Sequence, residues 1–156
     1  LDEPTAYLVR HLLTRVVAIG TARSLALALP QSLPLAGKTG TSDQSRDSWF
    51  AGFGGDALGV AWIGRDDNHS VGLTGASGAL RVWIETLREV GITPVNLEPP
   101  PTIEWHRVTA DGASLVGEDC LGAVLVPLNI EHLPNILNSC EAVPDGVLGS
   151  GQNLQR

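Results

Sequence analysis

The segment PLAGKTGT, at residues 34–41, contains Lys38, the only lysine of a 156-residue chain that also has nine arginines. A lysine ammonium is a compact charge on a flexible stem, whereas an arginine guanidinium is a planar fork. Every other basic side chain with a permanent charge is an arginine, so we infer that the position of Lys38 requires an ammonium and not a guanidinium. We expect residues 35–41 to form a strand on which a functional site is built around Lys38.

The neighbours of Lys38 are glycines and threonines. Gly37 and Gly40 leave room for another backbone or a ligand to approach closely. Thr39 and Thr41 are two positions apart, so their hydroxyls lie on the same side of an extended segment. This pattern predicts a compact anion site. The alternative is a surface salt bridge of Lys38 on an edge strand, where lysine also deters aggregation, but it would leave the glycines and threonines unexplained.

The composition is that of a folded protein, with 43% hydrophobic and 17% charged residues. A net charge of −7 argues against nucleic acid or anionic lipid as a partner, because both are bound through clustered cations. No apolar run approaches the roughly 20 residues that span a bilayer, and no signal sequence opens the chain. The first residue is leucine and not methionine, which we take to indicate a fragment or a processed chain.

Hydrophobic periodicity predicts an α+β fold in which helices cover an antiparallel sheet. Strands are expected at residues 35–41, 48–53 and 58–65. Helices are expected from the cap Asp2 to Gly20, from the cap Thr21 to Leu29, and from the cap Ser77 to Gly91. In the third strand, bulky and small residues alternate, so the small face leaves room for a helix to pack closely.

Four aromatic residues occur at strand and helix spacing, namely Trp49, Phe50, Trp62 and Trp83. They could form a ligand-stacking surface, but aromatic residues at such positions are far more often part of the core. We therefore expect all four in the core.

The Glu-Pro-Pro-Pro segment at residues 98–101 can be neither helix nor central strand, and it marks a boundary. We divide the chain into a main region at 1–96, a Pro-rich connector at 97–101 and a small β-rich C-terminal module at 102–156. Short strands are expected at 102–108 and 121–128. Residues 143–156 have few apolar anchors, and we expect a flexible tail there.

The Lys-Thr-Gly motif at 38–40 is followed, in matching order and spacing, by DSWFAGF at 47–53, VAWIGRD at 60–66 and LTGASGAL at 73–80. Together these segments resemble the bifunctional class A penicillin-binding proteins, well over residues 2–99 and more loosely over the tail. The resemblance implies a partial penicillin-binding or β-lactamase-like transpeptidase fold. It also implies that residues 1–96 are the C-terminal part of the transpeptidase domain of a peptidoglycan synthase, with glycosyltransferase activity upstream.

In this family the Lys-Thr-Gly strand is one wall of a cleft in which a serine attacks a stem peptide or a β-lactam. The resemblance therefore implies catalytic roles for Lys38 and Thr41 and substrate-binding roles for Thr39, Gly40 and Thr41. The threonine hydroxyls would hold the substrate carboxylate, and the backbone N–H of Thr41 would serve the oxyanion hole. Gly40 would let the ligand lie against the strand.

The chain lacks two other motifs of the family. Its only lysine has Leu35 three positions before it, so there is no Ser-x-x-Lys nucleophile motif, and no Ser-x-Asn sequence occurs. We therefore predict that this chain alone is inactive, whereas the resemblance implies that the complete protein would be a penicillin-sensitive D,D-transpeptidase. The alternative is a non-catalytic periplasmic module that docks peptidoglycan or a regulator. A compact β-lactamase fits less well, because of the proline-linked tail. Arg46 and Asp47 also match the family, and we expect them to form a local ion pair.

The resemblance further implies partners and a compartment. The partners would be D-Ala-D-Ala stem peptides, β-lactams, a periplasmic regulator and the missing N-terminal part of the protein, with no cofactor, metal or nucleic acid. The location would be the periplasmic face of the inner membrane, with an upstream anchor. In that oxidising compartment the only two cysteines, Cys120 and Cys140, would form a disulfide, with unpaired core thiols as the alternative. A zinc site is not expected, because His106 and His132 are scattered.

Overall fold

The fold is described from a computed structural model, and the structure describes residues 1–29 and 33–136. The chain forms two compact units, Leu1–Pro100 and Pro101–Arg156, and each is described by itself. Within the described ranges, no helix combines the length and the apolar character that a membrane span requires. The same residues contain no group of three or more His, Cys, Asp or Glu side chains that could hold a metal ion.

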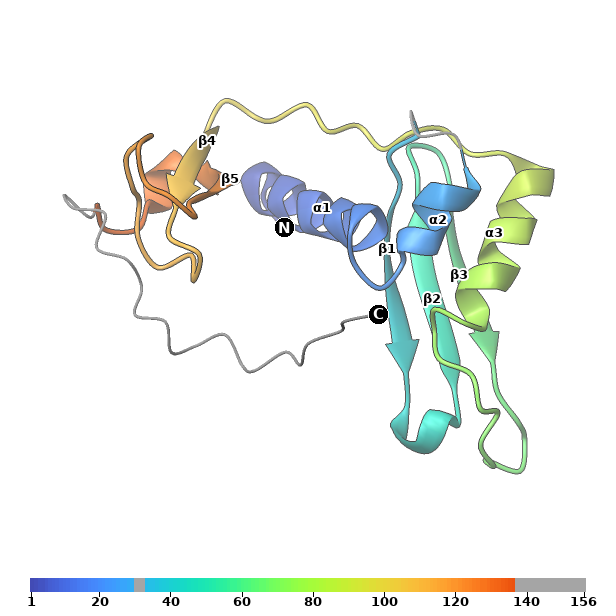
Figure 1. Cartoon of the computed structure of the whole chain (residues 1–156). Helices are drawn as coiled ribbons and strands as arrows, with labels where there is room; N and C mark the ends of the chain where they lie inside the picture. The colour runs from blue at the N-terminus through green and yellow to red at the C-terminus, as the bar shows by residue number, and fades with distance from the viewer. Residues whose placement is uncertain (30–32, 137–156) are drawn as a thin grey trace. The chain divides into compact units, whose positions relative to one another are not determined.

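The first unit is a three-stranded antiparallel sheet with helices (Figure 1). Its elements in chain order are α1 (Glu3–Ala18), α2 (Arg23–Ala28), β1 (Ala36–Thr41), the 3-10 turn η1 (Asp43–Ser45), β2 (Ser48–Phe53), β3 (Leu58–Ile63) and α3 (Ala79–Val90). The strand order is β1-β2-β3, so β1 and β3 are the two edges. The predicted α+β class is confirmed, and each predicted strand is present with ends that differ by at most two residues.

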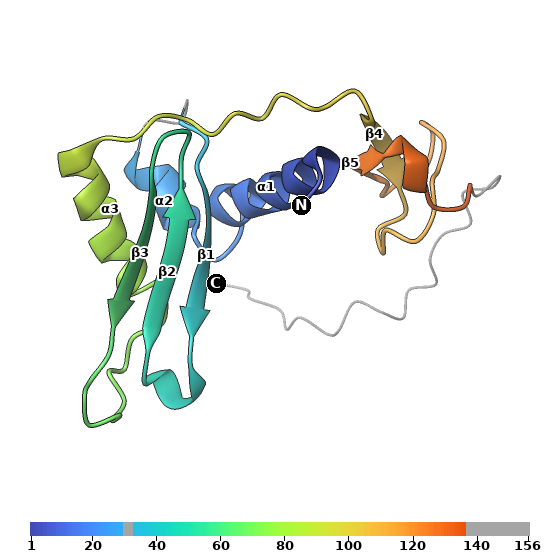
Figure 2. The same cartoon turned by 180° about the vertical axis from the view of Figure 1, so that it is seen from behind.

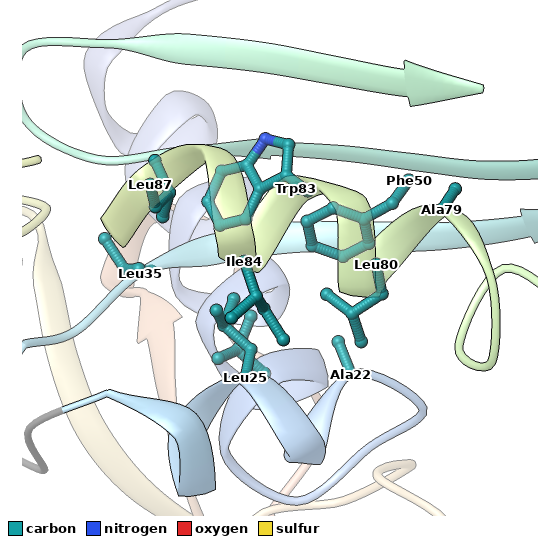
Figure 3. Close-up of a cluster of buried hydrophobic side chains, with 10 residues drawn as sticks. Ala22, Leu25, Leu35, Phe50, Ala79, Leu80, Trp83, Ile84 and Leu87 are labelled. Atoms are coloured by element: carbon teal, nitrogen blue, oxygen red, sulfur yellow. The ribbon is translucent and has the colours of Figure 1, made fainter. Parts of the chain in front are cut away.

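One face of the sheet packs against α3, and α1 and α2 contribute side chains to the same buried cluster (Figures 1 and 2). On this face the rings of Phe50 and Trp83 meet edge to face, with centroids 5.0 Å apart (Figure 3). Trp83 Nε1 also donates a hydrogen bond to the carbonyl of Gly59, at 3.1 Å. A Cβ at position 59 would lie 2.8 Å from that nitrogen, so the small face of β3 admits α3, as predicted. The buried cluster consists of Val17, Ala22, Leu25, Leu35, Phe50, Ala79, Leu80, Trp83, Ile84 and Leu87.

The prediction that all four aromatic residues are buried is wrong for Trp49 and Trp62. These residues are 44% and 48% exposed, whereas Phe50 and Trp83 are 0% and 4% exposed. Trp49 directly precedes Phe50 on β2, and successive side chains of a strand point to opposite faces. On that opposite face Trp49 pairs across the strands with Trp62, with ring centroids 6.0 Å apart. The helices therefore cover the Phe50 face, and the tryptophan face is half exposed.

The first two helices differ in how they begin. Asp2 caps α1 as predicted, because its Oδ1 accepts a hydrogen bond from the Thr5 N–H at 2.8 Å. The cap predicted at Thr21 is wrong, since α2 begins after Ala22 and has no side-chain cap. The hydroxyl of Thr21 points instead to the motif strand, as described below.

The cap predicted for α3 is also wrong. The N-cap position is Gly78 and not Ser77, whose hydroxyl accepts a hydrogen bond from the Thr74 N–H within the preceding loop. The first N–H of the helix, at Ala79, donates to the buried hydroxyl of Ser48 on β2, at 2.8 Å. Ser48 in turn donates to the Thr74 carbonyl, at 2.8 Å. The Ser48 side chain, which comes from the sheet, thus caps the N-terminus of α3 in place of a residue next to the helix.

The second unit contains a two-stranded antiparallel sheet. Its elements are β4 (Ile103–Val108), β5 (Val124–Asn129) and the 3-10 turn η2 (Ile130–His132). Both strands were predicted, and the second begins three residues later than expected. Cys120 is not a free thiol. Cys140 and the tail predicted to be flexible lie outside the described residues, so the Cys120–Cys140 pairing stays a prediction.

Candidate functional site

Lys38 lies exposed on β1, an edge strand of the sheet. Its Nζ donates a hydrogen bond to the carbonyl oxygen of Thr39, at 2.8 Å. Among the residues that the structure describes, Lys38 takes part in no ion pair, so the alternative of a surface salt bridge is not realised there. An ammonium has three N–H donors, and two of them remain for a ligand after the bond to Thr39.

The ammonium and the two threonine hydroxyls leave β1 on opposite faces. Thr39 is paired across the strands with Phe50, and Thr41 with Ser48, both of which belong to the covered face. Side chains alternate along a strand, so Thr39 and Thr41 share that face, as their spacing predicts, while Lys38 starts on the other. The ammonium then comes to the edge of β1, where the Thr39 carbonyl accepts its hydrogen bond.

Each threonine hydroxyl already has one partner within the chain. Thr39 Oγ1 lies 2.7 Å from Thr21 Oγ1, and one of the two hydroxyls donates to the other. Thr41 Oγ1 accepts a hydrogen bond from the N–H of Gly75, at 2.9 Å. A hydroxyl has one hydrogen to donate and two lone pairs. The Thr41 hydrogen and one hydrogen of the Thr21–Thr39 pair are therefore left to donate to an anion.

The backbone N–H of Thr41 points away from β2. The next residue, Ser42, donates from its N–H to the carbonyl of Asp47, at 3.1 Å. Residues of an antiparallel pair alternate between hydrogen-bonded and non-hydrogen-bonded positions, so Thr41 and Thr39 face the outer edge. The bond from Lys38 Nζ to the Thr39 carbonyl agrees with this assignment. The outer edge of β1 thus presents the Lys38 ammonium and the backbone N–H of Thr41, while the hydroxyls of Thr39 and Thr41 lie on the adjacent covered face.

The two glycines of the motif, Gly37 and Gly40, have different structural roles. A Cβ at Gly37 would lie 2.5 Å from the ring of Phe50, so Gly37 makes space for the core and not for a ligand. A Cβ at Gly40 would meet only the Trp49 side chain, at 3.1 Å. A Cβ at Gly75 would lie 2.6 Å from the Gly40 carbonyl oxygen, so Gly75 packs closely against the strand at this point. Within the chain, Gly40 is thus bordered by Trp49 and by Gly75.

Two residues at this edge were missed by the sequence reasoning. Thr21 was interpreted as a helix cap, because a threonine before a helical pattern usually has that role. Gly75 was noted only as part of the segment LTGASGAL. For Gly75, the available signal was its place between Thr74 and the small residue Ala76. For Thr21 there was no signal, because no local pattern connects it with Thr39, 18 residues further on.

The expected ion pair between Arg46 and Asp47 is wrong. Arg46 Nη2 donates to Gln44 Oε1, at 2.8 Å. The Asp47 carboxylate accepts from the Ser42 hydroxyl at 2.9 Å and from Trp62 Nε1 at 3.0 Å. Asp47 therefore connects the start of η1 with β3 through neutral donors, and its carboxylate does not pair with the neighbouring Arg46 guanidinium.

The loop after β3 carries one perturbed carboxylate. Arg65 donates two hydrogen bonds to Asp67, at 2.9 and 2.7 Å, and the His69 N–H donates to the same carboxylate at 3.2 Å. These bonds, with those from Arg65 as the main cause, lower the Asp67 pKa to about 2. The loop is joined to the motif hairpin, since the Val71 N–H donates to the Ser45 carbonyl at 2.9 Å.

No protein-family model matches the chain. Curated relatives that match it include penicillin-binding protein 1B of Haemophilus influenzae, which is 42% identical over 112 residues, covering 72% of this chain and 14% of the relative. The protein of the same name from Escherichia coli is 43% identical, over 69% of this chain and 13% of its own length. That from Vibrio cholerae is 36% identical, over 92% of this chain and 18% of its own length. The chain therefore spans only a small part of these relatives.

A solved structure shares the fold. The crystal structure of penicillin-binding protein 1A from Haemophilus influenzae matches 86% of this chain and 21% of its own chain, with a TM-score of 0.74. The sequence identity is 24%, so this likeness shows the fold alone.

Proposed function

We propose that this chain, which is homologous to a short segment of the class A penicillin-binding proteins, is the C-terminal part of a transpeptidase domain in a peptidoglycan synthase. The observation that carries the proposal is the arrangement of β1, which presents the Lys38 ammonium and the Thr41 backbone N–H at its outer edge and the Thr41 hydroxyl on the adjacent covered face. This strand would form one wall of an acyl-transfer cleft.

Each group that β1 presents has a task in that chemistry. The Thr41 hydroxyl and one hydroxyl of the Thr21–Thr39 pair donate to the carboxylate of the bound stem peptide or β-lactam. The outward N–H of Thr41 donates to the oxyanion that develops on the attacked carbonyl. The Lys38 ammonium lowers the free energy of negative charge gathered at the edge, since two of its donors are not used by the chain.

The nucleophile comes from a part of the protein outside this chain, because no Ser-x-x-Lys sequence occurs in it. In the complete enzyme the serine oxygen forms an ester with the acyl group of the donor stem. The terminal D-alanine leaves with the proton of the serine hydroxyl. An amine of a second stem peptide then attacks the ester to form the amide cross-link, and the serine oxygen leaves with the proton of that amine. The partners are thus D-Ala-D-Ala stem peptides and β-lactams, and the location is the periplasmic face of the inner membrane.

Intact-mass spectrometry after incubation with penicillin tests this proposal. The complete protein should gain one penicilloyl group, mapped by peptide digestion to a serine outside the present sequence. This chain alone should gain none, in the same buffer and at the same concentration. A stoichiometric adduct on a serine of this chain would overturn the assignment of the region. A complete protein that forms no adduct would instead favour the non-catalytic periplasmic binding module.

A further inference from the structure

A hollow of about 880 Å³ lies between α2 and α3. Most of its polar lining comes from two places, the start of α2 with the turn before it and the start of α3 with the loop before it. These residues are Thr21, Arg23, Ser24, Thr74, Ser77 and Arg81, and the later turns of α3 add Glu85 and Arg88. Ala28 and the buried Ile84 contribute apolar surface. We call this site the arginine pocket.

The arginine pocket is positively charged in an acidic chain. Its lining includes three arginines and one acidic residue, whereas the net charge of the chain is −7. The acidic residue, Glu85, is paired with Arg88 at 2.7 Å, and Arg88 also reaches the Ala28 carbonyl at 3.5 Å. Arg23 and Arg81 form no ion pair with any residue that the structure describes. Two guanidinium groups of the pocket are therefore not neutralised by a carboxylate.

We propose that the arginine pocket binds a small ligand that carries a carboxylate on a short apolar stem. A guanidinium presents a planar fork of donors that matches a carboxylate with two parallel hydrogen bonds. The hydroxyl of Ser24 can add a further donor, and Ala28 and Ile84 offer contact to a methyl-sized group. A free phosphate shares the oxyanion chemistry but would not use the apolar surface.

This pocket is separate from the motif strand. Its lining does not include Lys38, Thr39 or Thr41, and it meets them only through Thr21, whose hydroxyl contacts Thr39. The inference therefore does not depend on the transpeptidase assignment, and either can fail without the other.

Amide chemical shifts of the ¹⁵N-labelled chain, titrated with N-acetyl-alanyl-alanine, test the inference. The largest shifts are expected at Ser24, Ser77 and Arg81. The same dipeptide with a C-terminal amide should bind at least about tenfold more weakly, since it lacks the charge that the guanidiniums recognise. Inorganic phosphate is titrated in parallel. A double variant, Arg23→Gln with Arg81→Gln, should weaken binding of the dipeptide at least about tenfold.

A control variant localises the effect. Arg107→Gln removes an exposed arginine from the second unit and should leave dipeptide binding unchanged. Thermal melts followed by circular dichroism show whether each variant folds. Equal binding by the double variant, or equal binding of the carboxylate and the amide, would overturn the inference. Phosphate bound through the arginines without the dipeptide would overturn the carboxylate assignment.

Discussion

The hydroxyl of Thr21 lies 2.7 Å from the hydroxyl of Thr39, and this contact joins the turn before α2 to the motif strand. The bond restricts the rotation of the Thr39 side chain and so fixes the direction in which its remaining hydrogen-bonding capacity points. It also gives Thr21 a share in the proposed carboxylate site, because the pair together retains one hydrogen to donate.

We predict that Thr21→Val in the complete protein slows acylation by a fluorescent penicillin about fivefold. The physical reason is the loss of one net hydrogen bond of about 1 kcal/mol, while the β-branched shape is kept. Thr86→Val is the matched control, since its hydroxyl bonds only to the carbonyl of Val82 in its own helix. An unchanged acylation rate for Thr21→Val would mean that the contact with Thr39 does not position the substrate.

We predict that Thr41→Val lowers stability as well as acylation. The hydroxyl of Thr41 accepts the N–H of Gly75, a buried residue, and valine would leave that donor unsatisfied. The expected loss is about 1 to 3 kcal/mol in free energy of unfolding. Denaturant titration measures it, and Thr41→Ser is the control, because serine keeps the acceptor. A valine variant as stable as the serine variant would contradict the proposed bond.

We predict that the Asp67 carboxylate titrates with a pKa of about 2, against an ordinary value of 3.8. Its pKa is depressed in the folded chain, so the contribution to stability is present above the ordinary value and is lost as the pH falls towards 2. Carboxyl chemical shifts measured against pH check the value. Arg65→Gln should move the Asp67 pKa upward, because Arg65 is the main cause of the depression, whereas Arg107→Gln should not. A midpoint near the ordinary value in the unaltered chain would mean that the Arg65 pair does not form in solution.

The sequence was sufficient for the strands because their signal is local. Alternating bulky and small residues with glycine-rich turns located β1, β2 and β3 within two residues at each end. It was not sufficient for the two later helix caps, since Ser48 reaches Ala79 from 31 residues away. The small residues of β3 indicated which face of that strand a helix would cover, but the two adjacent aromatic residues of β2, Trp49 and Phe50, were not distinguished. The placement of α3 on the Phe50 face makes only Phe50 part of the core.

The candidate site was predictable to a similar degree. The spacing of Thr39 and Thr41 gave their common face, and the single lysine directed attention to β1. Neither pattern could reveal that Thr21 and Gly75 already bond to those hydroxyls, because these contacts depend on how separate segments fold together. The ion pair predicted between Arg46 and Asp47 was wrong for the same reason, because Trp62 of β3 donates a hydrogen bond to the Asp47 carboxylate.

We predict a disulfide between Cys120 and Cys140 in protein produced in an oxidising compartment. The two cysteines are separated by nineteen residues, and a bridge across such a loop stabilises by about 3 kcal/mol in the chain-entropy model. Peptide mapping without reductant should recover one linked pair of peptides. Two thiols that react fully with iodoacetamide would rule the bridge out.

We predict that Lys38→Ala in the complete protein mainly impairs acylation and leaves the fold intact. The side chain is exposed and its bond within the chain is to the adjacent Thr39 carbonyl, so removing it opens no cavity in the core. The loss of one preorganised electrostatic contact to a developing oxyanion typically costs about 3 to 4 kcal/mol, on the order of a hundredfold to a thousandfold in rate. An exposed ion pair is worth about 1 kcal/mol or less, so the size of the effect separates the two roles of the lysine.

The measurement for Lys38→Ala is the second-order acylation rate with a fluorescent penicillin, beside a thermal melt of each variant. Arg107→Ala, which removes an exposed cation from the second unit, should acylate at the original rate. Lys38→Arg should remain impaired although it keeps the charge, because a planar fork cannot place its donors as an ammonium does. If Lys38→Ala acylated at the original rate, or lost activity only by unfolding, β1 could not be a wall of the catalytic cleft.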